Sequence, residues 1–296
     1  MLNSNVIRVF DPWRKGSLCT CPFKYTVNVY TGCGHRCIYC YITSYIRDAF
    51  NPRPKKDFIR LVMRDIRKIP AGSIIDVSTS SDPYTPPEEK LGLTRKLLGL
   101  IMKNFRVKIL TKSDLVVRDI DILKRGNSIV SMTITTMDER VAQIIEPYAP
   151  SPSKRIKALS MISKYGIPTI LRLDPILPFV NDSEKNIRNI IRDASKAGVK
   201  HIVSSTYKAK PDSLARIIRS FPDLGEKYRD LYIVKGSRIH GAYYLSKKIR
   251  LDLMRKVKEI ASDYGLTFAT CREGLVSLHD KGTICDGSHL FKAFNR

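Results

Sequence analysis

Six short apolar runs alternate with amphipathic segments over about two thirds of the chain, and this alternation constrains the fold more than any other feature. Strands are expected at 25–30, 73–79, 106–111, 129–135, 167–173 and 200–205. Helices are expected between them, near 38–48, 57–68, 89–104, 117–124, 138–145, 153–165 and 183–197. Repeated strand–helix units predict parallel strands with right-handed crossovers. An open doubly wound sheet and a closed or partial barrel both satisfy the pattern.

Polar residues follow five of these apolar runs. They occupy positions 79–82, 111–113, 135–136, 172–175 and 204–206. In barrels of parallel strands, active sites lie at the carboxyl ends of the strands. One such run could be an ordinary helix cap or turn, but five in succession predict a single polar site at one end of the sheet.

Three cysteines, Cys33, Cys37 and Cys40, follow the first predicted strand. Three thiolates at this CxxxCxxC spacing can hold three irons of a [4Fe–4S] cube. The fourth iron then has no ligand from the loop, and an open metal position is where a substrate or cofactor binds. Tyr39, an aromatic residue directly before the last cysteine, adds to the evidence for a cluster-binding loop.

Zinc and disulfides are the alternative uses of these cysteines. Structural zinc prefers four protein ligands, commonly in CxxC pairs, and the uneven spacing fits this arrangement less well. Disulfides are disfavoured because the chain holds seven cysteines, an odd number, and shows no signal peptide. A non-catalytic zinc-binding nucleic-acid module, with His35 or other cysteines completing the site, stays open on the residues alone.

Further motifs accompany the cysteine loop between residues 25 and 210. They are NVYTGC from 28 to 33, TSSDPYTP from 79 to 86, LGLTR from 91 to 95, ILTKS from 109 to 113, SMTITT from 131 to 136 and EPYAPSP from 146 to 152. With these motifs the chain resembles the radical S-adenosylmethionine (SAM) superfamily, and within it the spore photoproduct lyase-related branch, often described as DNA repair photolyase-like. The cysteine motif is highly specific for the superfamily, and the other runs are moderately specific for the branch.

The resemblance implies a fold, two cofactors and a chemistry. The fold is α/β, a partial (β/α)6 TIM-like barrel over residues 25–210. In the superfamily, SAM chelates the open iron of the [4Fe–4S] cluster, and one electron from the reduced cluster cleaves SAM to a 5′-deoxyadenosyl radical. That radical takes a hydrogen atom from the substrate, while the protein binds and orients the reactants. An electron donor such as ferredoxin or flavodoxin is implied as a partner.

The resemblance also implies candidate residues around SAM. Tyr39 would lie beside the adenine, and polar groups from successive strand ends would bind the rest of the molecule. These polar residues are Thr79, Ser80, Asp82, Lys112, Thr133, Thr135 and Arg172. Residues 79–82 would meet the methionine amino group, and Lys112 would pair with a carboxylate or a substrate phosphate. Thr133 and Thr135 would reach the ribose, and Arg172 would bind a carboxylate bidentately.

Both ends of the chain extend beyond the predicted barrel and carry the remaining cysteines. Residues 1–24 form an N-terminal extension with Cys19 and Cys21, and residues 211–296 form a C-terminal α/loop extension. This second extension contains predicted helices at 211–220 and 245–264, a short strand near 266–270, and the cysteines Cys271 and Cys285. The four cysteines could close a second site for zinc or another iron–sulfur cluster, although their spacing matches no strong signature and free cysteines are often buried.

The charge balance is strongly positive, at +24 from 52 Lys and Arg against 28 Asp and Glu. A protein this basic is expected to bind polyanions, so DNA or RNA is the expected partner; a general bias toward lysine and arginine is the alternative. No apolar stretch approaches the roughly 20 residues that span a bilayer. Free cysteines suit a reducing compartment, and a cytoplasmic protein is expected.

One feature departs from spore photoproduct lyase. That enzyme uses a cysteine of its own chain to return a hydrogen atom to the product radical, whereas here no cysteine occurs between residues 41 and 270. Reversal of a thymine dimer by that route is therefore in doubt. The leading hypothesis is a radical SAM enzyme that repairs a lesion or modifies a nucleotide in a nucleic acid. The alternative keeps the radical chemistry but acts on a peptide or small metabolite.

Overall fold

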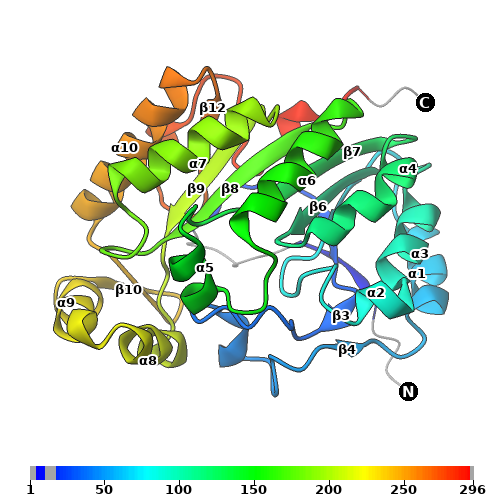
Figure 1. The fold of residues 1–296 in the computed structure, drawn as a ribbon. Coiled ribbons are helices and arrows are strands. Elements are labelled where there is room, and N and C mark those ends of the chain that lie inside the picture. The colour runs from blue at the N-terminus through cyan, green and yellow to red at the C-terminus, as the bar shows by residue number, and fades with distance from the viewer. Residues whose placement is uncertain (1–4, 11–17, 294–296) are drawn as a thin grey trace.

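The computed structural model describes residues 5–10 and 18–293, and its central feature is an eight-stranded sheet (Figure 1). The strand order is β1-β2-β5-β6-β7-β8-β9-β12. β1 pairs antiparallel with β2, and all the later neighbours are parallel. Among the described residues the order has two ends, β1 and β12, so the sheet forms the expected partial barrel.

All six predicted strands of the barrel are present, and the strand predicted near 266–270 adds a seventh parallel strand beside β9. The strand bounds are β1 Ile7–Val9, β2 Tyr25–Val27, β5 Ile74–Val77, β6 Arg106–Thr111, β7 Asn127–Thr133, β8 Thr169–Ile176, β9 His201–Thr206 and β12 Thr267–Thr270. Two small antiparallel pairs stand apart from this sheet: β3 Tyr30–Thr31 with β4 Arg53–Pro54, and β10 Ser237–Ile239 with β11 Ala242–Tyr244.

Helices cover one face of the sheet (Figure 1). They are α1 Phe58–Ile66, α3 Leu93–Ile101, α4 Ile120–Leu123, α6 Pro152–Lys164, α7 Glu184–Lys196 and α10 Lys247–Asp263. Other helices lie toward the end of the barrel where the strands finish: α2 Glu88–Leu91, α5 Glu139–Ile145, α8 Pro211–Ser220 and α9 Gly225–Arg229. Ser151, Ser183 and Ser246 cap α6, α7 and α10 by accepting hydrogen bonds from backbone N–H groups of the first turn.

Two of the predicted helices need correction. The α-helix predicted over 38–48 is wrong, because only a single 3-10 turn, Ile42–Ser44, forms there. The middle of this segment makes local turns, and backbone groups of Ile38 and Cys40 bond to distant parts of the chain, as described below. The helix predicted over 89–104 is divided at Gly92, whose φ of 60° ends α2 before α3 begins.

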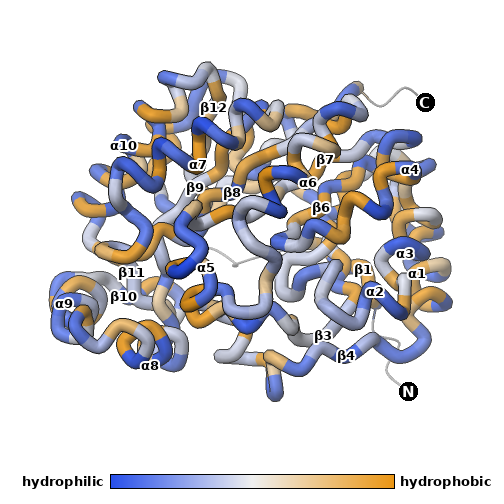
Figure 2. Tube along the Cα trace, in the orientation of Figure 1, coloured by the Kyte–Doolittle hydropathy of each residue, from blue (hydrophilic) through white to orange (hydrophobic). Residues whose placement is uncertain are grey.

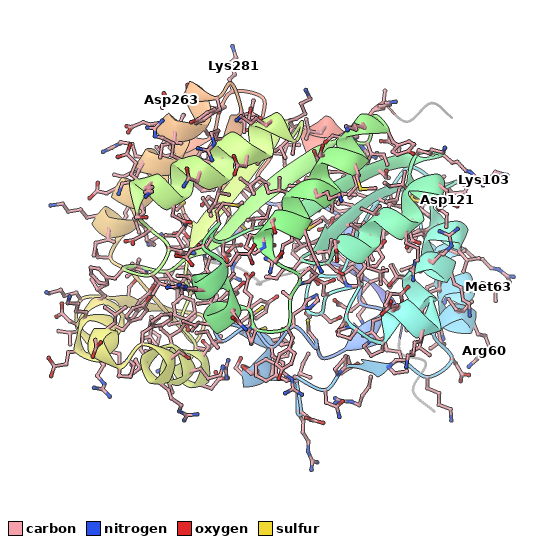
Figure 3. All side chains as sticks on the ribbon, in the orientation of Figure 1. Arg60, Met63, Lys103, Asp121, Asp263 and Lys281 are labelled. Carbon is pink, nitrogen blue, oxygen red and sulfur yellow. The ribbon has the colours of Figure 1, made fainter. Side chains whose placement is uncertain are left out.

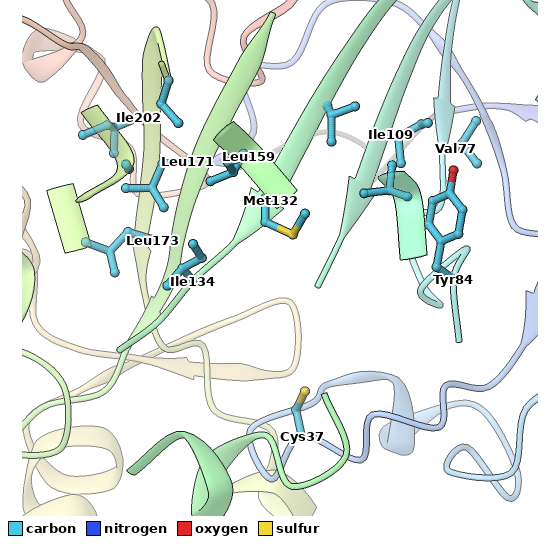
Figure 4. Close-up of a cluster of buried hydrophobic side chains, with 14 of the residues drawn as sticks. Cys37, Val77, Tyr84, Ile109, Met132, Ile134, Leu159, Leu171, Leu173 and Ile202 are labelled. Atoms are coloured by element: carbon cyan, nitrogen blue, oxygen red, sulfur yellow. The ribbon is translucent and has the colours of Figure 1, made fainter. Parts of the chain in front are cut away.

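Alternate residues of each strand face opposite sides of the sheet. On the helix-covered side, Met132 and Leu171 are fully buried in the main hydrophobic core together with Leu159 of α6 (Figure 4). Figure 2 shows hydrophobic residues concentrated on the strands and hydrophilic ones on loops and outer helix turns. The inner side carries a separate apolar group, formed by Ile129, Ile170 and Val203 with Cys271, Leu290 and Phe291 packed against it.

Segments near both ends of the described chain are held on the inner side by buried ion pairs. Asp76 and Lys108 alternate there with the apolar residues of β5 and β6. The Nζ atoms of Lys24 and Lys108 lie 2.7 Å and 3.1 Å from Asp76 Oδ2. Asp286, from the C-terminal tail, pairs with both lysines. The interior of the barrel therefore combines an apolar group with buried ion pairs, and residues of both extensions pack into it.

The outer surface is highly charged, and side chains such as Arg60, Lys103 and Lys281 project from it into solvent (Figure 3). Within the described part of the chain, no helix combines the length and the apolar character needed to cross a membrane.

Candidate active site

The cysteine loop begins with a glycine that no other residue replaces easily. Gly32 has a φ of 84°, and a Cβ atom at this position would lie 2.7 Å from the carbonyl oxygen of Ala49. The N–H of Cys33 donates to that same carbonyl at 2.8 Å. The N–H of Gly34 donates to Thr85 Oγ1 at 2.8 Å. These contacts hold the start of the loop against segments that follow it in the sequence.

The three loop cysteines lie beyond the carboxyl ends of the strands, as Figure 4 shows for Cys37. Burial raises the pKa of Cys33 and Cys37 to about 12 and that of Cys40 to about 11. The thiols therefore keep their protons at neutral pH until a metal replaces them. In the described residues, no three His, Cys, Asp or Glu side chains are placed to hold a single metal ion. A four-iron cube takes one thiolate on each iron, so its ligands need not share one ion position.

Asp82 connects the cysteine loop to two strand ends. One carboxylate oxygen accepts hydrogen bonds from Thr111 Oγ1 at 2.7 Å and from the N–H of Tyr84 at 2.9 Å. The other accepts from the N–H of Lys112 at 2.7 Å and lies 3.3 Å from His35 Nε2. Burial alone would raise the pKa of Asp82, but His35 and these hydrogen bonds lower it to about 2. The carboxylate is thus charged and already well supplied with partners.

Glu146 forms a second buried hydrogen-bond network beside the cysteine loop, which is the predicted cluster loop. It accepts hydrogen bonds from the Tyr39 hydroxyl and from Thr135 Oγ1, and it pairs with Arg155. Burial opposes its ionisation, but Arg155 and Lys112 keep its pKa below the ordinary value. Lys112 Nζ lies 5.6 Å from the centre of the Tyr39 ring. Tyr39, Lys112 and Thr135, three of the candidate SAM residues, therefore lie around one carboxylate that was not among the predicted site residues.

Thr79 and Ser80 lie at the end of β5, next to the cluster loop. Their backbone N–H groups both donate to Asn28 Oδ1, at 3.0 Å and 2.9 Å. The Thr79 carbonyl accepts from the Tyr41 hydroxyl at 2.5 Å, and Ser80 Oγ is 3.1 Å from the Tyr45 hydroxyl. Asn28 therefore holds the backbone of this strand end through two hydrogen bonds, and Tyr41 and Tyr45 of the cysteine loop contact it.

Arg172 faces the interior of the barrel, where Thr133 is its register partner on the neighbouring strand. Its Nη2 donates to Asp174 Oδ2 at 2.5 Å and to Cys271 Sγ at 3.2 Å. Ser205 Oγ donates to the other oxygen of Asp174 at 2.6 Å. The guanidinium thus already has a carboxylate partner from its own strand, instead of standing free for a ligand.

A family model described as the radical SAM superfamily matches residues 27–194, more than half of the chain. The chain belongs to the radical SAM superfamily. An uncharacterized protein of Methanocaldococcus jannaschii is 36% identical over 167 residues, which cover 54% of this chain and 63% of that protein. An uncharacterized protein of Mycobacterium tuberculosis is 25% identical over 265 residues, covering 83% of this chain and 76% of that protein. The chain therefore spans less than two thirds of the first of these relatives.

Solved structures place the fold in the same radical SAM group. Spore photoproduct lyase complexed with dinucleoside spore photoproduct superposes with a TM-score of 0.65 at 16% identity, covering 88% of this chain and 79% of that one. SuiB of Streptococcus suis, solved with S-adenosylmethionine bound, gives a TM-score of 0.50 at 16% identity, covering 83% of this chain and 49% of that one. At these identities the likeness establishes the fold, and it confirms the expected radical SAM type of barrel.

The residues of the loop fit the cluster that radical SAM proteins carry. The fit rests on three free thiols at one loop, with Cys37 buried and Cys33 and Cys40 half-buried. The cations Lys112 and Arg216 act on Cys40, and Lys112 also acts on Cys37. Such cations offset the negative charge that thiolate ligands bring to a buried site.

Arg216 of α8 is a residue of this radical SAM site that sequence reasoning missed. Its guanidinium donates to the carbonyls of Ile38 and Cys40, at 2.9 Å and 2.8 Å, and to Thr43 Oγ1 at 2.8 Å. Asp212, one turn earlier, holds the guanidinium at 3.0 Å. Its bonds to the carbonyls of Ile38 and Cys40 replace two of the intrahelical hydrogen bonds expected over 38–48. No local signal marks Arg216, because it lies about 175 residues beyond the loop.

Proposed function

We propose that this radical SAM enzyme binds a [4Fe–4S] cluster through Cys33, Cys37 and Cys40 and acts on a nucleic acid, either repairing a lesion or modifying a nucleotide. When bound, the cluster and SAM supply the radical that removes a hydrogen atom from the substrate. The proposal depends chiefly on three cysteines, one buried and two half-buried, that share one loop beyond the carboxyl ends of parallel strands, which is where barrel active sites lie.

The chain's own residues would hold SAM in the following way. Lys112 is half-buried, and its pKa lies above the ordinary value because Cys37 and Glu146 outweigh the effect of burial. It therefore stays cationic and suits the methionine carboxylate. Thr79 and Ser80 offer oxygen atoms at the neighbouring strand end. Asp82 has its partners within the protein, so we assign it a positioning role for the loop and the strand ends.

Exposed aromatic side chains surround this end of the barrel. Tyr45, Tyr148 and Phe179 are 57%, 60% and 54% exposed. The Arg36 guanidinium lies 5.0 Å from the Tyr148 ring centre, and Lys227 Nζ lies 5.3 Å from that of Phe179. Aromatic faces flanked by cations are suited to stacking bases while neutralising phosphates. Together with the net charge of +24, they favour a nucleic acid over an uncharged metabolite.

A matched pair of tyrosines tests this assignment. Tyr148 is 60% exposed under Arg36 and contacts the cluster loop, because its N–H donates to the His35 carbonyl. Tyr165 is 56% exposed under Lys124 and ends α6, at the opposite end of the barrel. Loss of one stacked base weakens binding by about 1–3 kcal/mol.

In fluorescence anisotropy with a single-stranded oligonucleotide, Tyr148→Ala is therefore expected to raise Kd by about 5- to 150-fold. Tyr165→Ala should leave Kd unchanged. Wild-type affinity should also fall steeply with salt. Equal effects of the two substitutions, or no binding at low salt, would contradict a nucleic-acid substrate and favour a peptide or small metabolite.

A further inference from the structure

The four cysteines outside the cluster loop are brought together inside the barrel from opposite ends of the chain. Cys21 Sγ and Cys285 Sγ lie 3.5 Å apart. The Cys19 thiol is hydrogen-bonded to Cys21, and Cys271 is close enough to Cys19 and Cys285 to interact with both electrostatically. Cys271 directly follows β12, and its sulfur accepts the hydrogen bond from Arg172. None of the four is part of a disulfide.

The separation of Cys21 and Cys285 suits two ligands of one metal. Tetrahedral metal–thiolate bonds of about 2.3 Å place two sulfur atoms about 3.8 Å apart, whereas a disulfide requires about 2.05 Å. The observed 3.5 Å is much closer to the first value. Two sulfur atoms from opposite ends of the chain at this distance, with two more cysteines nearby, provide the donor set of a soft metal site.

The side chains are not yet arranged around one ion. Among the described residues, no three His, Cys, Asp or Glu side chains converge in that way, and Cys271 is turned toward Arg172. Rotation of a cysteine from one staggered χ1 position to the next moves its sulfur by about 3 Å. Binding of an ion or a cluster therefore requires rotamer changes of the cysteines, including the turning of Cys271 away from Arg172.

Fixed cations surround this thiol group. Arg172 Nη2 is 3.2 Å from Cys271 Sγ. Lys24 acts electrostatically on Cys21 and is only 1% exposed, and it is itself held by Asp76 and Asp286. Thiolates at this site would thus face positive groups that are held in place by Asp174, Asp76 and Asp286, which lowers the cost of placing the negative charge of a metal–thiolate centre there.

We propose that Cys19, Cys21, Cys271 and Cys285 bind a second, thiolate-ligated metal centre inside the barrel, holding either a single zinc or iron ion or an iron–sulfur cluster. The centre joins the N-terminal segment to β12 and the C-terminal tail. It also sits directly beside Arg172, whose register partner Thr133 is a candidate SAM residue. The proposal is independent of the substrate proposed above, because it concerns residues outside the cluster loop.

The test uses the full chain with Cys33, Cys37 and Cys40 all changed to alanine, so that any remaining metal reports on the second site. Zinc, iron and sulfide are measured as purified and after anaerobic reconstitution, and the chelator-treated protein is titrated with Co²⁺. We expect either one equivalent of zinc or iron with a tetrahedral Co²⁺–thiolate spectrum, or a brown protein with iron and sulfide. Adding Cys21→Ser or Cys285→Ser should abolish this binding.

Circular dichroism separates loss of metal from loss of fold. If the serine variants unfold, the triple-alanine protein alone can show whether the four remaining cysteines bind metal, through their reactivity toward a thiol reagent. Its four thiols are expected to be protected with metal and to react after chelation. A triple variant that takes up no metal under any of these conditions would overturn the proposal, as would a Cys21–Cys285 disulfide detected by mass spectrometry.

Discussion

Replacing Arg216 by alanine removes the clamp that holds the cluster loop to α8. The guanidinium bonds two loop carbonyls, those of Ile38 and Cys40. A hydrogen bond to a charged group contributes about 1.5–3 kcal/mol. Because 21% of the Arg216 side chain is exposed, water can replace part of the hydrogen-bond energy. We therefore take the lower value, about 1.5 kcal/mol, for each bond. Their sum, about 3 kcal/mol, corresponds to an approximately 100-fold increase in opening of the loop.

The assay is anaerobic loss of iron from the reconstituted protein to a chelator, followed by absorbance. Arg216→Ala is expected to release its loop iron about 100-fold faster than wild type. Arg216→Lys keeps the charge but loses the planar fork, so it should also release iron faster than wild type. Arg219→Ala, on the exposed side of the same helix, is the control. An Arg216→Ala protein that keeps its iron as long as this control does would refute the reasoning.

Three further substitutions probe the network, the pH response and the core. Glu146→Gln leaves Arg155 buried without its countercharge and should lower the free energy of unfolding by about 3–5 kcal/mol, measured by urea denaturation. Burial lowers the pKa of His201 from 6.5 to about 3 in the folded protein, so the unfolded chain binds more protons between these values and stability falls as pH drops below 6.5; at pH 5 the loss is about 2 kcal/mol. In His201→Gln this part of the pH dependence should vanish, and unchanged curves would contradict the assignment. Leu159→Ala should cost about 2–5 kcal/mol of stability while iron content per folded chain stays at the wild-type level; a loss of iron instead would show that this core supports the site directly.

The strands and the cluster loop could be predicted because their signals are local. Apolar runs mark the buried strands, and the spacing of Cys33, Cys37 and Cys40 marks the loop. The same local reasoning produced the wrong helix at 38–48, since it could not include Arg216, which satisfies that backbone from a distant helix. Helical periodicity alone does not show where hydrogen-bond partners come from.

The candidate SAM residues show a similar division. Lys112 and Thr135 were identified from their position after apolar strands, but Glu146, which gathers both near Tyr39, lies in a loop motif with no periodic signal. Arg172 was predicted to bind a carboxylate of a ligand. In the structure it pairs with Asp174, only two residues away. An inward-facing arginine is predictable from strand alternation, but its partner depends on a local irregularity of β8.

The most direct test of the central claim is anaerobic reconstitution with iron and sulfide, followed by dithionite reduction and assay of 5′-deoxyadenosine formed from SAM. The account predicts about four irons at the loop, SAM cleavage by the wild type, and loss of both in Cys37→Ala, with any further iron remaining at the second site. A wild-type protein that binds no iron and forms no 5′-deoxyadenosine would contradict the account.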